Sequence, residues 1–224
     1  HPCEARCRRN MVDDAVNIRG LKRMAADYAG KVPPPECAPS TGKTVAVIGG
    51  GPGGLSAAYY LQLMGHQVTV YEMLPELGGM LRYGIPNYRL PKDRLNEDIQ
   101  AILDTGVKVK YGLRIGQDIT VQELRASYDA VLITIGASTD KKLGIEGEDA
   151  EGVMSAVRFL RDVGKGINPD LTGQEVAIVG GGNVSMDAVR SAVRLGAKKV
   201  SILYRRRTAD MTALPAEIEG AIAE

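Results

Sequence analysis

The sequence of 224 residues has no tryptophan, one phenylalanine and three cysteines. Three cysteines cannot build the disulfide framework of a small secreted domain. They form no C-x-x-C pair, which excludes a redox-active dithiol of that spacing. No apolar run approaches the roughly 20 residues that a helix needs to cross a bilayer, so we expect no membrane span. Neither sign of charge is in excess, with 28 basic and 27 acidic residues, and we expect no nucleic-acid partner.

Glycine, in contrast, is abundant at 27 residues, and hydrophobic residues make up 44% of the chain. Tight strand-to-helix turns need glycine, so this composition favours an α/β fold with a substantial core. The chain starts with polar and charged residues, which do not resemble a signal peptide, and a cytoplasmic location is expected. It does not start with methionine, so we expect an upstream segment.

Residues 1–41 are expected to be a helical arm of an upstream domain, followed by a linker. Residues 1–30 are charged and predicted to be helical, and residues 32–40 are rich in proline, which is typical of a linker. A loose apolar stripe marks the predicted helix. Its members are Val12, Val16, Ile18, Leu21 and Met24.

Residues 44–72 are predicted to form a β-α-β unit. The continuous apolar run over 44–48 is typical of a buried parallel strand. A glycine-rich turn, a helix over about 53–64 and a strand over 67–71 follow it. The further elements expected are a loop over 75–91, a helix that begins near Pro91, and strands over 107–111 and 130–135.

Residues 175–203 repeat this pattern, with a strand, a glycine turn, a helix and a second strand. The two copies align without a gap over 45–65 and 176–196. Such a repeat is a much stronger signal than one glycine motif. The sequence therefore predicts an α/β fold with two Rossmann-like dinucleotide-binding domains, at 42–150 and 151–224.

Gly49, Gly51 and Gly54 follow the first predicted strand in the spacing G-x-G-x-x-G. The first glycine allows the tight turn, the second lets backbone approach a pyrophosphate, and the third lets the helix pack on the strand. The helix N-terminus then offers N–H groups to the phosphates. Glu72 ends the next strand, where a carboxylate accepts hydrogen bonds from a ribose. The alternative is a glycine-rich turn in an unrelated α/β protein, with Glu72 as a solvated strand end.

The second turn, at 180–185, has Ser185 in place of the third glycine. The position that matches Glu72 is Tyr204, and arginines follow it at 205–207. An acid here binds the 2′-hydroxyl of NAD, whereas arginines stack on adenine and pair with a 2′-phosphate. The second site is therefore predicted to favour NADP(H). The alternative is that the arginines form a solvated basic patch or a partner surface.

Cys3 and Cys7 are spaced to place both thiols on one face of a helical turn. They could be ligands of a metal or a cluster, but an iron–sulfur cluster usually takes four. From spacing alone, two free thiols are the simpler interpretation. Cys37 lies in the predicted linker without a partner pattern.

Several short segments carry a resemblance that covers essentially the whole chain. They lie at 3–9, 16–23, 78–86, 89–91, 134–137, 180–187 and 204–206. Together they resemble the small (β) subunit of glutamate synthase and its relatives. Those relatives include the large subunit of electron-bifurcating ferredoxin:NADP oxidoreductase and the reductase half of dihydropyrimidine dehydrogenase. The loop at 78–91 is much more specific than either glycine motif.

The resemblance implies FAD in the first domain and NADP(H) in the second, which is inserted into the first. The implied FAD site comprises Gly49, Gly51, Pro52, Gly54, Leu55, Glu72, Gly79, Met80, Leu81, Arg82, Ile115, Gly136 and Ala137. The implied NADP(H) site comprises Gly180, Gly182, Asn183, Val184, Ser185, Asp187, Arg205, Arg206 and Arg207. Cys3 and Cys7 match the last two thiolates of a 4Fe-4S cluster whose other two ligands lie upstream.

The chain departs from the family pattern in three places. The family's Met-Pro-Ala is Met211-Thr212-Ala213 here, the upstream cysteines are absent, and the chain stops at Glu224, within the second domain. The segment that completes the FAD domain is therefore expected to be missing, and both domains are expected to be incomplete.

The predicted chemistry is hydride transfer from the nicotinamide of NADPH to FAD. Single electrons then pass through clusters to a partner such as the large subunit of glutamate synthase. Because the flavin performs the hard step, no catalytic acid or base is predicted. The alternatives are a subunit of the ferredoxin:NADP oxidoreductase type, a truncated fragment that binds a nucleotide without turnover, and a self-contained reductase of a small molecule.

Overall fold

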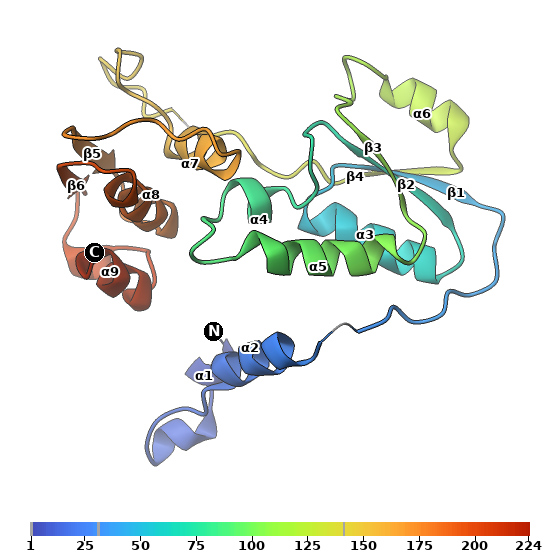
Figure 1. The fold of residues 1–224 in the computed structure, drawn as a ribbon, viewed down its shortest axis with the longest axis horizontal. Coiled ribbons are helices and arrows are strands. Elements are labelled where there is room, and N and C mark those ends of the chain that lie inside the picture. Colours follow the sequence, from blue (N-terminus) through green and yellow to red (C-terminus); the bar gives the residue numbers. More distant parts are fainter. Residues whose placement is uncertain (1, 31, 141) are drawn as a thin grey trace. The chain divides into compact units, whose positions relative to one another are not determined.

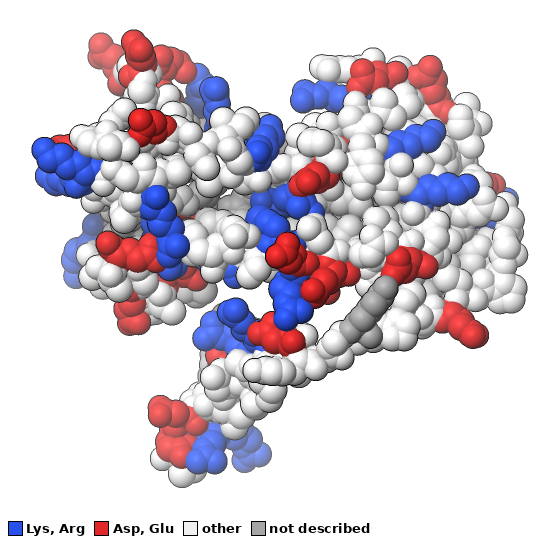
Figure 2. All heavy atoms as spheres, viewed as in Figure 1, with Lys and Arg blue, Asp and Glu red and all other residues white. Residues whose placement is uncertain are grey.

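The computed structural model describes residues 2–30, 32–140 and 142–224 (Figure 1). The chain divides into two compact units, His1–Pro34 and Pro35–Glu224. In the described ranges, none of the helices combines the length and the apolar character that a bilayer-spanning segment requires. Basic and acidic side chains are interspersed over the face drawn in Figure 2, as a formal net charge of +1 allows.

The first unit has short helices instead of the helix expected over 1–30. Cys7 has extended backbone angles (φ −63°, ψ 127°), which interrupt the helical conformation. The prediction that Cys3 and Cys7 share one helical turn is therefore wrong. Glu4 joins the helices, because its Oε1 accepts a hydrogen bond from the backbone N–H of Arg19 at 2.9 Å. The elements are α1 (Pro2–Ala5), η1 (Arg8–Met11) and α2 (Ile18–Tyr28).

The second unit begins within the predicted linker. The backbone N–H of Ala38 donates to the carbonyl of Leu63 at 2.8 Å, and that of Thr41 donates to Gly65 at 3.0 Å. A Cβ at Gly65 would lie 2.2 Å from the carbonyl oxygen of Pro39. Residues 38–41 therefore pack against the end of the first long helix of the unit.

A four-stranded parallel sheet, in the order β3-β2-β1-β4, forms the centre of this unit. Figure 1 shows α3 and α5 on one face of the sheet and α6 on the other. This arrangement is a doubly wound α/β domain, and the expected fold class is confirmed. The strands are β1 (Thr44–Ile48), β2 (Gln67–Glu72), β3 (Lys108–Tyr111) and β4 (Ala130–Ile133). The helices are α3 (Pro52–Leu63), α5 (Lys92–Leu103) and α6 (Val121–Ser127).

Alternate side chains of the two central strands fill two cores. Val47 and Val70 are fully buried against α3 and α5. Ala46 and Ile48 pack on the other face, against Leu124 of α6. The two-residue repeat of a strand produces this alternation. Each buried aliphatic side chain contributes about 1.5–3 kcal/mol, so the apolar run over 44–48 reflects burial on both faces.

A smaller parallel sheet, β5-β6, repeats the β-α-β pattern. On one face, Phe159 and Leu160 of α7 pack with Ala188 of α8. On the other face, Val179 and Leu203 are 61% and 54% exposed. The elements are α7 (Ala156–Gly164), β5 (Glu175–Val179), α8 (Asn183–Arg194), β6 (Lys199–Leu203), η2 (Thr208–Asp210) and α9 (Pro215–Ile222).

Strand β4 ends at Ile133, two residues earlier than expected. The next residue, Thr134, turns its hydroxyl to the carbonyl oxygens of Ile48, at 2.9 Å, and Gly49, at 3.1 Å. The end of β4 is thereby held against the start of the first glycine turn.

Candidate dinucleotide-binding sites

The first glycine turn follows β1 and is too tightly packed for side chains. Gly49 has a positive φ of 105°, and its N–H donates to the carbonyl of Tyr71 at 2.8 Å. A Cβ at Gly49 would lie 2.5 Å from the carbonyl oxygen of Thr134, and one at Gly54 would lie 1.8 Å from that of Gly49. The first and third glycines therefore have the roles that the spacing predicts, namely the tight turn and the close helix.

Glu72 lies beside this turn, at the end of β2, and is only 6% exposed. Its Oε2 accepts a hydrogen bond from the N–H of Gly50 at 2.7 Å, and its Oε1 accepts one from Leu74 at 2.8 Å. Each carboxylate oxygen has a further lone pair for another donor. The burial of Glu72 contradicts the alternative that it is a solvated strand end.

The segment at 78–82, far along the chain, is brought against the same turn. The N–H of Gly78 donates to the carbonyl of Gly50 at 2.8 Å. Gly79 has a φ of 51°, and a Cβ there would lie 2.7 Å from the Cα of Gly51. Gly79 also precedes a short helix that the sequence analysis did not predict, α4 (Met80–Tyr83). The structure thus unites two of the motifs assigned to FAD.

Four other residues assigned to FAD lie exposed at or just beyond these segments. Pro52 is the first residue of α3, and Met80, the first residue of α4, is 41% exposed. Gly136 and Ala137 follow Thr134 at the carboxyl end of β4 and are exposed. Their contacts with FAD stay a prediction.

The remaining side chains assigned to FAD contact other parts of the protein and are buried or partly buried. The buried Arg82 donates to the carbonyl of Leu77 at 2.5 Å and to Asn96, and it pairs with Glu76 at 2.9 Å. Its guanidinium is thus engaged by protein partners. Leu55 and Leu81 pack in the core beneath α3, and Ile115 packs in the core on the opposite face of the sheet. Leu81 and Ile115 are only partly buried, and contacts of these four residues with FAD stay a prediction.

The second glycine turn repeats the first in detail. The N–H of Gly180 donates to the carbonyl of Leu203 at 2.9 Å, as that of Gly49 does to Tyr71. Tyr204 therefore stands where Glu72 stands in the first β-α-β unit, as the sequence predicts. The side chain of Ser185 fills the space next to Gly180, because a Cβ at Gly180 would lie 2.7 Å from the Ser185 Oγ.

A loop at 208–214 wraps around the second turn. The Tyr204 hydroxyl donates to the carbonyl of Asp210 at 3.0 Å, and the Tyr204 ring lies 2.9 Å from where a Cβ at Gly181 would be. Ala213 donates its N–H to Gly181 at 3.0 Å, and Leu214 donates its N–H to the Asn183 side chain at 2.9 Å. The loop is held to the turn although Thr212 replaces the family's proline.

The three arginines differ in their partners. Arg207 pairs with Asp210 at 3.1 Å, and this hydrogen bond lowers the pKa of the Asp210 carboxyl. Arg205 and Arg206 are exposed and have no hydrogen-bond or ion-pair partner among the described residues. Two of the three guanidinium groups are therefore free to meet a phosphate.

Among the other residues assigned to NADP(H), Val184 is 45% exposed in the first turn of α8, whereas Asp187 is buried. Both oxygens of Asp187 accept hydrogen bonds from Nη1 of Arg89, at 2.9 and 2.8 Å. Burial raises the pKa of the Asp187 carboxyl, and Arg89 opposes that shift. The carboxylate is engaged within the protein, a role that the sequence analysis missed.

In the first unit, Cys7 is partly buried and Cys3 is exposed. Hydrogen bonds from the backbone N–H groups of Val16 and Arg9 lower the pKa of the Cys7 thiol. Within residues 2–30, 32–140 and 142–224, no group of three or more His, Cys, Asp or Glu side chains is placed to hold a metal. The two cysteines alone therefore do not complete a metal site.

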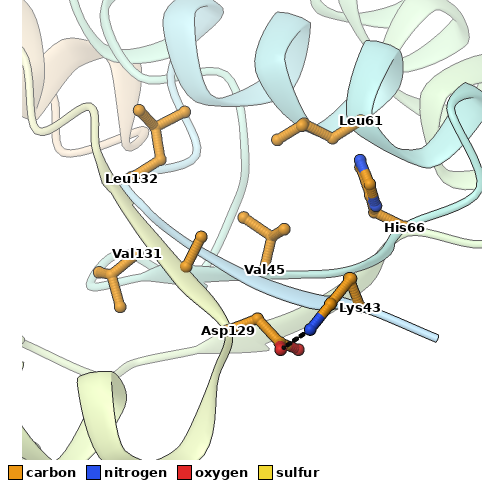
Figure 3. A pocket seen from close by; sticks show the side chains of 8 residues that line it. Lys43, Val45, Leu61, His66, Asp129, Val131 and Leu132 are labelled. Atoms are coloured by element: carbon orange, nitrogen blue, oxygen red, sulfur yellow. Dashed lines mark hydrogen bonds and ion pairs between the residues drawn. The ribbon is translucent and has the colours of Figure 1, made fainter. Parts of the chain in front are cut away.

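A cavity of about 560 Å³ lies at the opposite end of the sheet from the glycine turns (Figure 3). Leu61, Val45 and Leu132 line it, beside the ion pair of Lys43 with Asp129 at 2.8 Å. Lys43 and Asp129 precede β1 and β4, whereas ligands of parallel α/β sheets bind beyond the carboxyl ends of the strands. This cavity is not part of the dinucleotide sites. His66 also lines it, and its Nδ1 is hydrogen-bonded to Thr41 Oγ1 at 2.7 Å.

Comparison with known proteins gives concordant results. Residues 43–224 match the family model described as pyridine nucleotide-disulphide oxidoreductase. The chain is 45% identical, over 100% of its length, to the NADP(+)-dependent formate dehydrogenase subunit beta of Moorella thermoacetica and spans 35% of that protein. It is 35% identical to the glutamate synthase (NADPH) small chain of Escherichia coli, over 98% of this chain and 49% of that one. The solved structure of Mycobacterium tuberculosis FprA in complex with NADPH has the same fold, with a TM-score of 0.69 and 24% identity over 83% of this chain and 48% of that chain.

Two glycine turns, each between a parallel strand and a helix, define a protein with two dinucleotide-binding units. The chain belongs to the pyridine nucleotide-disulphide oxidoreductase family. The resemblance to glutamate synthase small subunits is confirmed by the relatives that carry that name. The chain spans about half the length of the Escherichia coli protein and about a third of the Moorella protein.

Proposed function

We propose that the chain is the dinucleotide-binding part of a flavoprotein oxidoreductase that takes electrons from NADPH and passes them to a partner subunit. One contrast between the two β-α-β units carries the proposal. The buried carboxylate of Glu72 follows β2, whereas Tyr204 and the free Arg205 and Arg206 follow β6. The first β-α-β unit therefore suits a ribose without a 2′-phosphate, and the second β-α-β unit suits a ribose that carries one.

The first β-α-β unit and the segment at 78–82 fit FAD. Bare backbone at Gly51 and Gly79 leaves the N-terminus of α3 open to a pyrophosphate, and the close approach of these two glycines leaves no room for a side chain at Gly79. Glu72 would accept hydrogen bonds from the ribose hydroxyls and would repel a 2′-phosphate. When bound, FAD supplies the acceptor for the hydride that NADPH releases as it becomes NADP⁺.

The second β-α-β unit fits NADPH. Gly180 and Gly182 form the turn at the N-terminus of α8, a helix of 12 residues whose first N–H groups and dipole favour a pyrophosphate. Arg205 and Arg206 would pair with the 2′-phosphate or stack on the adenine. The relatives support this choice, because the Moorella and Escherichia coli proteins are named for NADP(+) and NADPH.

The electron acceptor is proposed to be a partner subunit, such as the large subunit of glutamate synthase or a similar protein. The support is that the relatives are named as a subunit beta and as a small chain. Cys3 and Cys7 are proposed to hold a 4Fe-4S cluster together with two upstream ligands. The N–H groups directed at Cys7 fit this role, because hydrogen bonds to sulfur stabilise a ligating thiolate.

The test is a visible spectrum of the purified protein under anaerobic conditions, before and after each nicotinamide cofactor. We expect a flavin band that NADPH bleaches at concentrations where NADH has little effect. Equal bleaching by both cofactors would contradict the assignment of the second site. A protein that is colourless, and stays so after incubation with FAD, would contradict the assignment of the first.

A further inference from the structure

The two dinucleotide-binding β-α-β units are joined by a buried ion cluster that the nucleotide motifs do not explain. Arg89 lies in the loop between α4 and α5, in the domain that contains the first β-α-β unit. Its Nη1 donates to both oxygens of Asp187 on α8, and its Nη2 donates to Glu217 on α9 at 2.7 Å. The side chains of Arg89, Asp187 and Glu217 are 28%, 8% and 15% exposed. One planar guanidinium thus bridges α8 of the second β-α-β unit and α9, which follows that unit.

The neighbouring Tyr88 also packs against α8. The guanidinium carbons of Arg190 and Arg194, both on α8, lie 4.6 and 4.2 Å from the centroid of its ring, within the range of cation–π attraction. Burial raises the pKa of Tyr88 to about 12, so its hydroxyl stays neutral. Both arginines also pair with Glu224, at 2.6 and 2.8 Å. The loop is therefore fixed to α8 by a ring as well as by an ion pair.

The ion pair of Arg89 with Asp187 connects two chain segments that each reach one of the nucleotide sites. Gly79, which touches the first glycine turn, and Arg89 belong to the same loop region. Asp187 belongs to α8, whose first residue, Asn183, adjoins the second glycine turn. A second contact supports the first, because a Cβ at Gly164 of α7 would lie 3.0 Å from the carbonyl oxygen of Arg82.

We propose that Arg89 is a positioning residue that sets the orientation of the NADPH-binding unit relative to the FAD-binding unit. The inference rests on the proposed function, because the two units must face each other for hydride transfer. Reacting atoms need to approach within about 3–3.5 Å, and a displacement of about 1 Å can slow a reaction by about 100-fold. The planar fork of arginine can bridge Asp187 and Glu217 at fixed angles, whereas the single ammonium group of lysine cannot.

The test measures anaerobic flavin reduction by stopped flow in the purified holoenzyme, with Arg89→Lys and Arg89→Gln compared with wild type. We expect Arg89→Lys to lower the limiting rate at saturating NADPH by about tenfold or more. The apparent Kd for NADPH should stay within about threefold, and flavin content should be unchanged, because neither nucleotide site loses a ligand. Any long-wavelength charge-transfer absorbance between NADPH and oxidised flavin should weaken in parallel.

Arg158→Gln is the matched control, since Arg158 forms an exposed pair with Asp162 on α7 and should leave both constants unchanged. Arg89→Gln leaves the carboxylates of Asp187 and Glu217 without their partner, so this variant can fail to fold. Arg89→Lys retains the positive charge, so its kinetics decide whether Arg89 positions the two units. A raised Kd with an unchanged limiting rate would overturn the proposal and make the cluster part of nucleotide binding. Wild-type kinetics in Arg89→Lys would overturn it too. If wild type itself were not reduced by NADPH, the proposed function would fail instead.

Discussion

Glu72 accepts a hydrogen bond from the backbone N–H of Gly50 at 2.7 Å, so the end of β2 holds the middle of the first glycine turn. The same carboxylate is the proposed acceptor for the ribose of FAD. One buried side chain therefore shapes the turn and is the proposed ribose acceptor, which makes its removal informative.

We expect Glu72→Ala to lose flavin and to lower the free energy of unfolding by about 1–3 kcal/mol, because Gly50 and Leu74 lose the acceptor for their N–H groups. Flavin content per protein and urea unfolding measure the two effects. Glu175→Ala, at an exposed position at the start of β5, is the control and should change neither. Full flavin content in Glu72→Ala would show that this carboxylate does not hold the ribose.

The two free arginines give the second prediction. Replacing Arg205 and Arg206 together by Gln should raise the KM for NADPH by at least about 10- to 100-fold, because even one charge-assisted hydrogen bond to a phosphate contributes about 1.5–3 kcal/mol. The KM for NADH should hardly change, because NADH has no 2′-phosphate. Arg207→Gln should have a smaller effect, since Asp210 already engages that guanidinium. An equal loss for both cofactors would refute the phosphate assignment.

Two adjacent glycines of α3 give a matched pair of variants. A Cβ at Gly54 would lie 1.8 Å from the carbonyl oxygen of Gly49, whereas one at Gly53 would meet its nearest neighbour at 3.9 Å. We expect Gly54→Ala to unfold at lower urea concentration and to lose flavin, because α3 must shift. Gly53→Ala should be neutral or more stable by up to about 1 kcal/mol, since alanine is the better helix former. Equal stability of the two variants would contradict the close approach.

The fourth prediction concerns acid stability. Hydrogen bonds from Lys43 and Thr44 lower the pKa of Asp129 to about 2, from an unfolded value of about 4. A depressed folded-state pKa stabilises the native state above the unfolded value, and this stabilisation is lost as the pH falls from about 4 to about 2. The stability difference between wild type and Asp129→Asn should therefore be present at neutral pH and shrink below about pH 4.

Thermal unfolding at pH 7, 4 and 3 measures this difference. Asp98→Asn, which removes the same charge from the exposed side of α5, serves as the control. A difference between wild type and Asp129→Asn that stayed constant down to pH 3 would show that the bonds to Lys43 and Thr44 do not form.

Much of the architecture could be predicted because its signals are local. The apolar run over 44–48, the glycine spacing at 49–54 and the repeat at 175–203 depend on backbone preferences and on burial of whole strands. The structure confirms these elements to within one or two residues. The segment over 2–30 is helical as expected but is divided into short helices, because helix propensity does not reveal that Cys7 adopts an extended conformation.

The candidate sites were only partly predictable. Glu72 and Tyr204 could be placed because each ends a strand next to a glycine turn. The resemblance assigns Arg82 and Asp187 to the nucleotides, but in the structure their side chains are engaged by protein partners. Nothing in the local sequence around Asp187 indicates a partner 98 residues away at Arg89.

The sequence by itself determined that this chain has two β-α-β units with different residues after their second strands, because turn glycines, apolar strand segments and the residue at each strand end are encoded locally. Only the tertiary structure decided which charged side chains remain free for a ligand. It left Arg205 and Arg206 free and engaged Arg82, Arg207 and Asp187. The physical reason is that a charged group buried or held at close range takes the nearest partner of opposite charge, and which partner is nearest depends on how distant segments pack.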